Sequence, residues 1–113
     1  MNSIHSIEDL EAFIAGSHEQ PAVLFKHSTR CPISAQAAEE MKQVTAQFEG
    51  KNIAFGLVLV VEDREVSLAA QDKLGVKHES PQVMLLKDGS VIWHDSHHQI
   101  RCDRLESILS PVS

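Results

Sequence analysis

Two short apolar runs with a helical pattern between them constrain the fold of this chain more than any other feature. The runs are Ala22–Phe25 and Ile53–Val61, and neither alternates between apolar and polar residues. Unbroken apolar runs of this length are typical of strands that are buried on both faces of a sheet. Apolar residues at helical spacing lie between the runs, namely Ala37, Met41, Val44 and Phe48. Two strands joined through a helix are expected to be parallel, with a right-handed crossover.

The remaining apolar patterns predict two more strands and three more helices. Val83–Leu86 is a third strand-length run, and the Asp88-Gly89 pair after it is a strong signal for a hairpin that returns through Val91–Trp93. Further helices are predicted from Ser6 to Gly16, from Glu65 to Leu74 and from Asp103 to Pro111. The predicted order is α-β-α-β-α-β-β-α. We expect residues 1–113 to form a single α/β domain, with a four-stranded mixed sheet flanked by helices.

The charge and hydropathy patterns exclude several classes of partner. Acidic residues outnumber basic residues, 16 to 10, which gives a net charge of −6 without a long basic block. Nucleic acid is not an expected partner, because phosphate recognition needs clustered positive charge. No apolar run approaches the roughly 18 residues that a membrane span needs. Met1–Glu11 lacks the pattern of a signal peptide, so we expect a cytoplasmic protein. The charge pattern has no self-complementary patch, and we expect a monomer.

Cys31 and Cys102 are the only cysteines of the chain. Two cysteines are too few for the disulfide framework of a secreted scaffold, and a cytoplasmic protein keeps its thiols reduced by default. Neither cysteine belongs to a Cys-x-x-Cys pair. A four-cysteine zinc site is excluded, whereas a mixed His/Cys site stays open because the chain has seven histidines.

Cys31 lies between the first predicted strand and the helix that follows it. Pro32 suits the first helical position, because its φ is fixed at a helical value and its missing N–H is not needed there. The unpaired N–H groups and the dipole of a helix start favour thiolate over thiol. Ser34 is one turn away and is expected to donate a hydrogen bond to the sulfur. Positive charge comes from three basic neighbours, Lys26, His27 and Arg30. A buried, inert cysteine is the alternative, but these polar and basic neighbours favour a reactive Cys31.

Several motifs of the chain resemble those of a known family. The element order, Cys31-Pro32-Ile33-Ser34 at a strand-to-helix turn, and Ser80-Pro81 before the third strand look like a thioredoxin fold. The resemblance is to the monothiol bacilliredoxins, the YtxJ-like members of the bacillithiol redox system. It rests on Phe25–Ser28, Cys31–Ser34, Val76–Gln82, and Trp93–His94 with Ser96-His97. The resemblance covers nearly the whole chain and implies a cis Ser80–Pro81 peptide that faces the Cys31 sulfur.

The resemblance implies a thiol–disulfide oxidoreductase that removes bacillithiol, a low-molecular-weight thiol, from mixed disulfides with proteins. Its catalytic residues would be Cys31, which attacks the disulfide and becomes capped by bacillithiol, and Ser34, which replaces a resolving cysteine. No bound cofactor is expected; bacillithiol is the co-substrate and bacillithiolated proteins are the partners. The motif residues alone do not choose between bacillithiol and glutathione. The residues expected to contact the substrate or the small thiol are Lys26, His27, Arg30, Pro32, Ser80, Pro81 and His97.

The loop between the hairpin and the last helix holds Cys102 and three histidines. In a thioredoxin fold this loop returns to the active-site edge, so Cys102 is a candidate resolving thiol; the alternative is a helix-start residue with no redox partner. A Cα separation from Cys31 well beyond about 7 Å, with no mobile loop to close the gap, would exclude the resolving role. His94, His97, His98 and Cys102 have offsets compatible with a metal, but adjacent histidines in a loop usually point apart. We therefore expect no metal. Solvated or packing roles are the alternative for these histidines, and binding of the small thiol's carboxylates by His97 is favoured over a metal.

Two other function classes remain open. In the first, a dimer would hold an iron–sulfur centre through one Cys31 from each chain and two small thiols, although Pro32-Ile33 after the cysteine argues against such an adaptor. In the second, the chain would be a redox-inert docking domain of thioredoxin-like fold in which Cys31 is incidental. The docking domain predicts that Cys31→Ser leaves the function intact.

Overall fold

The computed structural model describes residues 1–113, and its elements follow the predicted order with one strand added. The elements are β1 (Asn2–Ser3), α1 (Ile7–Gly16), β2 (Ala22–His27), α2 (Pro32–Gln47), β3 (Ala54–Leu59), α3 (Arg64–Leu74), β4 (Gln82–Lys87), β5 (Ser90–Ser96) and α4 (Cys102–Leu109). Two short 3₁₀ turns, η1 (His97–Gln99) and η2 (Ser110–Val112), flank α4. The added strand is β1, whose two polar residues carry no strand pattern. No helix has the length and the apolar composition that a bilayer span requires.

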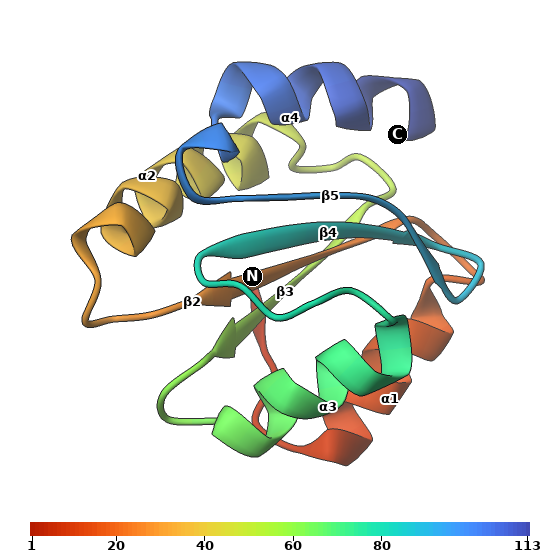
Figure 1. Ribbon diagram of the computed structural model, residues 1–113. Coiled ribbons are helices and arrows are strands. Elements are labelled where there is room, and N and C mark those ends of the chain that lie inside the picture. Colours follow the sequence, from red (N-terminus) through yellow and green to blue (C-terminus); the bar gives the residue numbers. More distant parts are fainter.

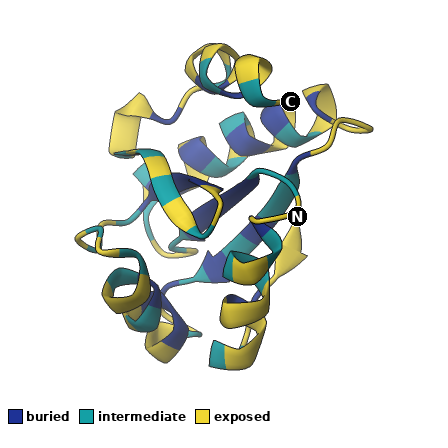
Figure 2. Ribbon diagram, turned by 90° about the vertical axis from the view of Figure 1, so that its right-hand side faces the viewer, coloured by how far each residue is buried: buried dark blue, intermediate teal, exposed yellow.

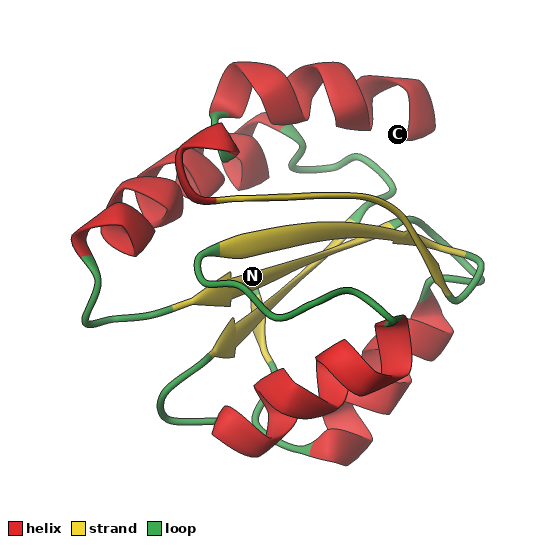
Figure 3. Cartoon of the chain, in the orientation of Figure 1, coloured by secondary structure: helices red, strands yellow, loops and turns green.

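The strands form one mixed sheet in the order β1-β3-β2-β4-β5. β2 and β3 are parallel, as predicted, and β4 runs antiparallel to both β2 and β5. Helices α2 and α4 cover one face of the sheet, and α1 and α3 cover the other (Figure 1 and Figure 3). Lys26 at the end of β2 pairs with Gln82 at the start of β4, which pairs with Ser96 at the end of β5. One edge of the sheet therefore carries Pro81, the loop after β5 and the turn between β2 and α2 that contains Cys31 (the Cys31 turn).

Local signals explain where several elements begin and end. Ser6 caps α1 as expected, because the Asp9 N–H donates to Ser6 Oγ (3.1 Å). Gly75 ends α3 in the left-handed region, with φ at 70°. Asp88 and Gly89 both have positive φ, 54° and 81°, as a two-residue hairpin turn requires. The predicted β4–β5 hairpin is thus confirmed.

The core is centred on β2, which is buried from Ala22 to Lys26 (Figure 2). Phe25 packs in the cluster that includes α2 and α4, whereas Leu24 packs in the cluster that includes α1 and α3. The missing alternation in this run reflects burial on both faces of the sheet, as predicted. β3 is only partly buried, because beyond it the sheet has only the two residues of β1.

The start of the last helix differs from the prediction. α4 begins at Cys102 rather than at Asp103, and its N-cap residue, Arg101, makes no side-chain capping hydrogen bond. The Cys102 N–H instead donates to Glu40 Oε1 on α2 (2.9 Å). A carboxylate from a neighbouring helix therefore replaces the local cap, and its charge suits the positive end of the α4 dipole. This contact fixes the start of α4 against the middle of α2.

Candidate active site

Cys31 is the N-cap residue of α2. Its backbone is extended, with φ at −116° and ψ at 124°, and Pro32 occupies the start of the helix as predicted. Its carbonyl accepts a hydrogen bond from the Ala35 N–H (3.0 Å), and its side chain makes no capping bond. The residue is half-buried and its thiol is free. The sulfur therefore stands at the positive end of a sixteen-residue helix, where negative charge is stabilised.

Ser34 connects the end of β2 to the first turn of α2. Its side chain is fully buried. Ser34 Oγ accepts the Ser28 N–H (2.9 Å) and lies 2.7 Å from His27 Nδ1. No hydrogen bond joins Ser34 to Cys31, so the expected donation to the sulfur is not observed. The reason is competition, because Ser28 and His27 already engage the hydroxyl.

His27 is half-buried, and its ring stacks on Phe25 with the centroids 5.6 Å apart. Burial lowers the pKa of His27, and the nearby Glu62 carboxylate opposes the shift. The imidazole is therefore neutral at pH 7. Because Ser34 Oγ already accepts the Ser28 N–H, its hydroxyl donates a hydrogen bond to His27 Nδ1 in the tautomer with the proton on Nε2. This corrects the expectation that His27 adds positive charge beside Cys31. His27 instead fixes the orientation of the Ser34 hydroxyl.

Lys26 does not lie where the sequence suggested. Its side chain is fully buried, and Nζ donates to Ser67 O of α3 (2.9 Å) and to His78 Nδ1 (3.1 Å). Burial lowers the pKa of Lys26 to about 8. The side chain is thus directed to the α3 face of the sheet and cannot reach a substrate carboxylate, which corrects the predicted role. Arg30 is exposed beside Cys31 and forms no ion pair, so its predicted contact with substrate stays a prediction.

Ser80 and Pro81 lie at the same edge of the sheet as Cys31. The Ser80–Pro81 peptide is cis, as the family resemblance implied. Pro81 O accepts the His97 N–H (3.0 Å), which attaches η1 to the start of β4. The antiparallel register sets Gln82, the next residue, beside Lys26 at the end of β2. Four separate segments of the chain therefore converge there: the Cys31 turn, the Ser80–Pro81 peptide, the end of β5 and η1.

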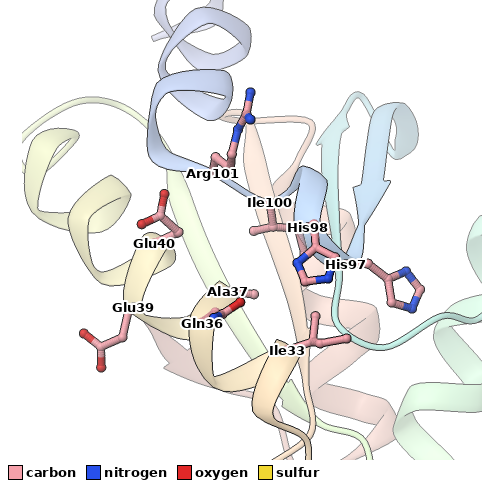
Figure 4. Close-up of a pocket in the computed structure, with 9 residues that line it drawn as sticks. All are labelled: Ile33, Gln36, Ala37, Glu39, Glu40, His97, His98, Ile100 and Arg101. Carbon is pink, nitrogen blue, oxygen red and sulfur yellow. The ribbon is translucent and has the colours of Figure 1, made fainter.

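A groove of about 420 Å³ runs between the first turns of α2 and the η1 segment. Figure 4 shows that the His97 and His98 side chains diverge from each other as they leave η1. The end of the groove closest to Cys31 is lined by Ile33, two residues after Cys31 in the chain. The groove is lined by Ile33, Gln36, Ala37, Glu39, Glu40, His97, His98, Ile100 and Arg101. No three His, Cys, Asp or Glu side chains are grouped closely enough to hold a metal ion.

Residues 2–105 of the chain match the family model for the monothiol bacilliredoxin BrxC. The chain belongs to the monothiol bacilliredoxin family. A solved candidate oxidoreductase with a thioredoxin fold shares 27% identity, covers 94% of this chain and 90% of its own length, and superimposes with a TM-score of 0.83. Thioredoxins from Fasciola hepatica and Malassezia sympodialis are 16% and 15% identical, both with a TM-score of 0.78. The match with the Fasciola hepatica thioredoxin covers 100% of both chains. The match with the Malassezia sympodialis thioredoxin covers 99% of this chain and 90% of that thioredoxin.

The family and the fold together make this bacilliredoxin-family member a thiol redox protein with a thioredoxin-like fold. The thioredoxin fold expected from the resemblance is therefore confirmed. The likeness to the two thioredoxins concerns the fold alone.

Cys102 lies far from Cys31. Its Sγ donates to Gln47 Oε1 (3.3 Å) at the end of α2, and its N–H donates to Glu40 in the middle of that helix. Cys31 stands at the opposite end of α2. With a rise of about 1.5 Å per residue, Gln47 lies about 24 Å along the helix from Cys31. The contact of Cys102 Sγ with Gln47 therefore keeps the two cysteines well beyond the disulfide limit of about 7 Å, and this arrangement does not support the candidate resolving role of Cys102.

The surroundings of Cys102 also favour its thiol form. Burial raises the pKa of Cys102, and the negative charges of Glu40, Glu106 and Asp103 raise it further. A raised pKa leaves little thiolate at pH 7, and the thiolate is the form that attacks disulfides. Cys102 is thus a structural residue of the α2–α4 contact.

Sequence reasoning missed Arg101 in the groove and His78 beside Lys26. Arg101 was overlooked because nothing in the local sequence separates it from other loop cations; only the start of α4 at Cys102 sets it beside α2. His78 belongs to a motif that carried the family resemblance, yet its contact with Lys26 joins residues 52 positions apart. Both contacts depend on tertiary structure.

Proposed function

We propose that this protein removes bacillithiol from mixed disulfides with proteins, and that Cys31 is the attacking thiol. The observation that carries the proposal is the single available thiol at the site. Ser34 stands where a dithiol enzyme has its second cysteine, and Cys102 lies against the other end of α2. A mixed disulfide formed on Cys31 then has no internal exit, which suits an enzyme that takes a small thiol from its substrate.

The attack by Cys31 on the client disulfide needs no external oxidant or reductant, because one disulfide is exchanged for another. The Cys31 thiolate attacks the bacillithiol sulfur of the mixed disulfide, and a bond from Cys31 to bacillithiol forms as the substrate disulfide breaks. The client protein leaves as a thiolate and takes a proton from water. The number of disulfides is unchanged. The thiolate of a free bacillithiol molecule then attacks the bacillithiol sulfur on Cys31, so that bacillithiol disulfide forms and Cys31 leaves as a thiolate.

The neighbours of Cys31 supply the supporting roles. The start of α2 stabilises the thiolate, while Ser34 and His27 hold the turn that carries it. Arg30 and Pro32 are exposed next to Cys31 in the chain, which supports a contact with the client protein. The backbone at Ser80 offers hydrogen bonds to an extended client segment, as when a peptide adds to a sheet edge.

The groove beside η1 suits the small thiol. Bacillithiol carries a malate-derived dicarboxylate and a free amine. Arg101, His97 and His98 offer N–H donors for carboxylates, and Glu39 and Glu40 lie on the α2 side, where an amine would pair. We propose no bound cofactor, a monomeric protein and a cytoplasmic location, in which bacillithiol and its client proteins would be the partners.

The test uses a purified client protein carrying bacillithiol on one cysteine. Release of the client thiol is followed with the wild type, with Cys31→Ser and with Cys102→Ser, and a glutathionylated client is run beside it. We expect release by the wild type, loss of at least about a thousandfold in Cys31→Ser, and a change below about twofold in Cys102→Ser.

Each other outcome removes one part of the proposal. Equal release by Cys31→Ser would reject Cys31 as the nucleophile and assign the exchange to another group. Faster release from the glutathionylated client would reject bacillithiol as the preferred thiol. A wild type that is inactive on both clients would reject the enzyme.

A further inference from the structure

Lys26 is the only charged residue in the buried core, and it has no acidic partner. No ion pair of the protein includes it; its ammonium contacts are the Ser67 carbonyl and the His78 ring nitrogen. Burying an ammonium without a counterion is costly, and methionine would fill a similar volume without that cost. The position lies five residues before Cys31, on the strand that leads to it. Such a costly group at the edge of a reactive site points to a role in that site.

The contacts of Lys26 lead to the segment between α3 and β4. His78 Nδ1 receives the Lys26 ammonium and lies 3.3 Å from Ser67 Oγ, while the His78 N–H donates to Gln71 Oε1 (2.6 Å). Gln82 Nε2 closes the other end of the segment by donating to Lys77 O (2.9 Å). Residues 76–80 are therefore held from inside by a polar cluster of Lys26, Ser67, Gln71, His78 and Gln82. Two residues after His78 comes Ser80, whose backbone precedes Pro81.

The polar cluster is not fully closed. Gln82 is the cross-strand neighbour of Lys26, and its Oε1 is buried without a hydrogen-bond partner. Ser80 Oγ is likewise buried and unpaired. An ammonium has three N–H donors, and two of those of Lys26 are used. Unused hydrogen-bonding capacity thus flanks Pro81 on both sides. Lys26 joins this segment to β2, and Gln71 and Ser67 join it to α3.

We propose that Lys26 is a positioning residue for thiol–disulfide exchange: acting through His78, its ammonium fixes the backbone of Ser80 and Pro81 at the edge where the Cys31 turn lies. The predicted effect on kcat/KM rests on the proposed function. The predicted effect on amide hydrogen exchange rests on the fold alone. Lys26 itself contacts neither the substrate nor the sulfur. A displacement of about 1 Å at such a site can cost about a hundredfold in rate, so this positioning has a measurable effect.

The charges around the pair determine how pH acts on it. Burial lowers the pKa of His78, the positive charges of Lys26 and Arg64 lower it further, and Glu79 opposes them. His78 is therefore neutral at pH 7, and its Nδ1 can accept a hydrogen bond from the Lys26 ammonium. Lys26 loses its charge as the pH rises through about 8. Hydrogen bonds from a charged donor are roughly twice as strong as neutral ones, so the hold on residues 76–80 weakens above that pH.

The test compares Lys26→Met with Lys77→Met, in which an exposed lysine of the same segment is changed and the Lys26 cluster is left intact. Two rates are measured from pH 6.5 to pH 9.5: kcat/KM on the bacillithiolated client, and alkylation of Cys31 by iodoacetamide, which needs no docking edge. We expect Lys26→Met to lower kcat/KM about tenfold or more and to leave alkylation within about twofold. The ratio of the two rates should fall near pH 8 in the wild type and in Lys77→Met, and stay flat in Lys26→Met.

A second readout does not depend on catalysis. Amide hydrogen exchange should show loss of protection confined to residues 76–82 in Lys26→Met, and none in Lys77→Met. If Lys26→Met loses protection throughout, the double variant Lys26→Met/His78→Phe replaces both partners by apolar groups and is measured in its place. Unchanged protection at residues 76–82, or an unchanged kcat/KM with a retained pH dependence, would overturn the inference. A wild type without client turnover would reject the proposed function, and the exchange data would still decide the positioning role.

Discussion

Cys31 and Cys102 both stand at the start of a helix, and both side chains are half-buried. Cys31 is bonded only through its backbone, and Arg30 precedes it without an ion pair. Cys102 donates its thiol to Gln47, and its pKa is raised first by burial and then by three carboxylates. Both helix dipoles act in the same direction, so the surroundings of each thiol make the difference. At Cys102, burial and nearby carboxylates oppose the thiolate that a helix start would favour.

The largest expected effect comes from giving Cys31 a resolving thiol in its own helix turn, because Cys102 is too far away for that role. Ser34→Cys places a thiol one turn from Cys31, within the same helix start, and creates a Cys-x-x-Cys pair. The bacillithiol cap on Cys31 should then be displaced internally, and the capped form should fall at least about tenfold at steady state. Intact mass would show a species two mass units lighter in its place.

The control for this variant is Ser107→Cys, which adds a thiol on the exposed side of α4. It should leave the capped form unchanged. Persistence of the capped form in Ser34→Cys would contradict the view that the missing second thiol is what makes this a one-cysteine site.

A smaller effect is expected at Ser34, where a substitution should lower the free energy of unfolding and leave the rate of exchange by Cys31 nearly unchanged. Ser34→Ala leaves the Ser28 N–H and His27 Nδ1 without their partner, so the free energy of unfolding should fall by about 1–3 kcal/mol. Exchange by Cys31 should stay within about threefold, because the Ser34 hydroxyl does not contact the sulfur. Urea denaturation and client release measure the two effects, with the exposed Ser110→Ala as the control. A hundredfold loss of exchange at unchanged stability would show that the hydroxyl acts on the sulfur after all.

The smallest effect tests the acidic surroundings of Cys102. Glu40→Gln removes the largest of the charges that raise the pKa of Cys102 and keeps an oxygen for its N–H. The pKa should fall, and alkylation of Cys102 at pH 8 should rise about threefold. Mass analysis of the Cys102 peptide follows the rate, with Glu39→Gln on the neighbouring position as the control. No change in Glu40→Gln would mean that burial alone protects Cys102.

Local sequence signals determine most of the fold. The Ser6 cap, the Asp88-Gly89 turn and Pro32 at the helix start each act within a few residues, and each predicts its element correctly. β1 was missed because two polar residues carry no periodicity. The start of α4 was misplaced because its cap comes from Glu40, 62 positions away.

At the site, the sequence identified the turn but not the direction of its side chains. Cys31 and Pro32 stand where the pattern put them. The Lys26 side chain lies on the opposite face of the sheet from those of Phe25 and His27, because successive side chains of a strand point to alternate faces. In a strand that is buried on both faces, the sequence pattern does not indicate which face lies on the side of the reactive cysteine. The return of the loop after β5 to the active-site edge of the sheet suggests that Cys102 lies near Cys31. In the structure the chain continues along α2 before α4 begins, so Cys102 contacts the far end of α2.

The most direct test of the account is the site of modification when the wild type meets one equivalent of oxidised bacillithiol. Intact mass and peptide mapping together report how many bacillithiol groups bind and on which cysteine. The account predicts one adduct, on Cys31, with Cys102 as the free thiol. A loss of two mass units without an adduct, or an adduct on Cys102, would contradict it.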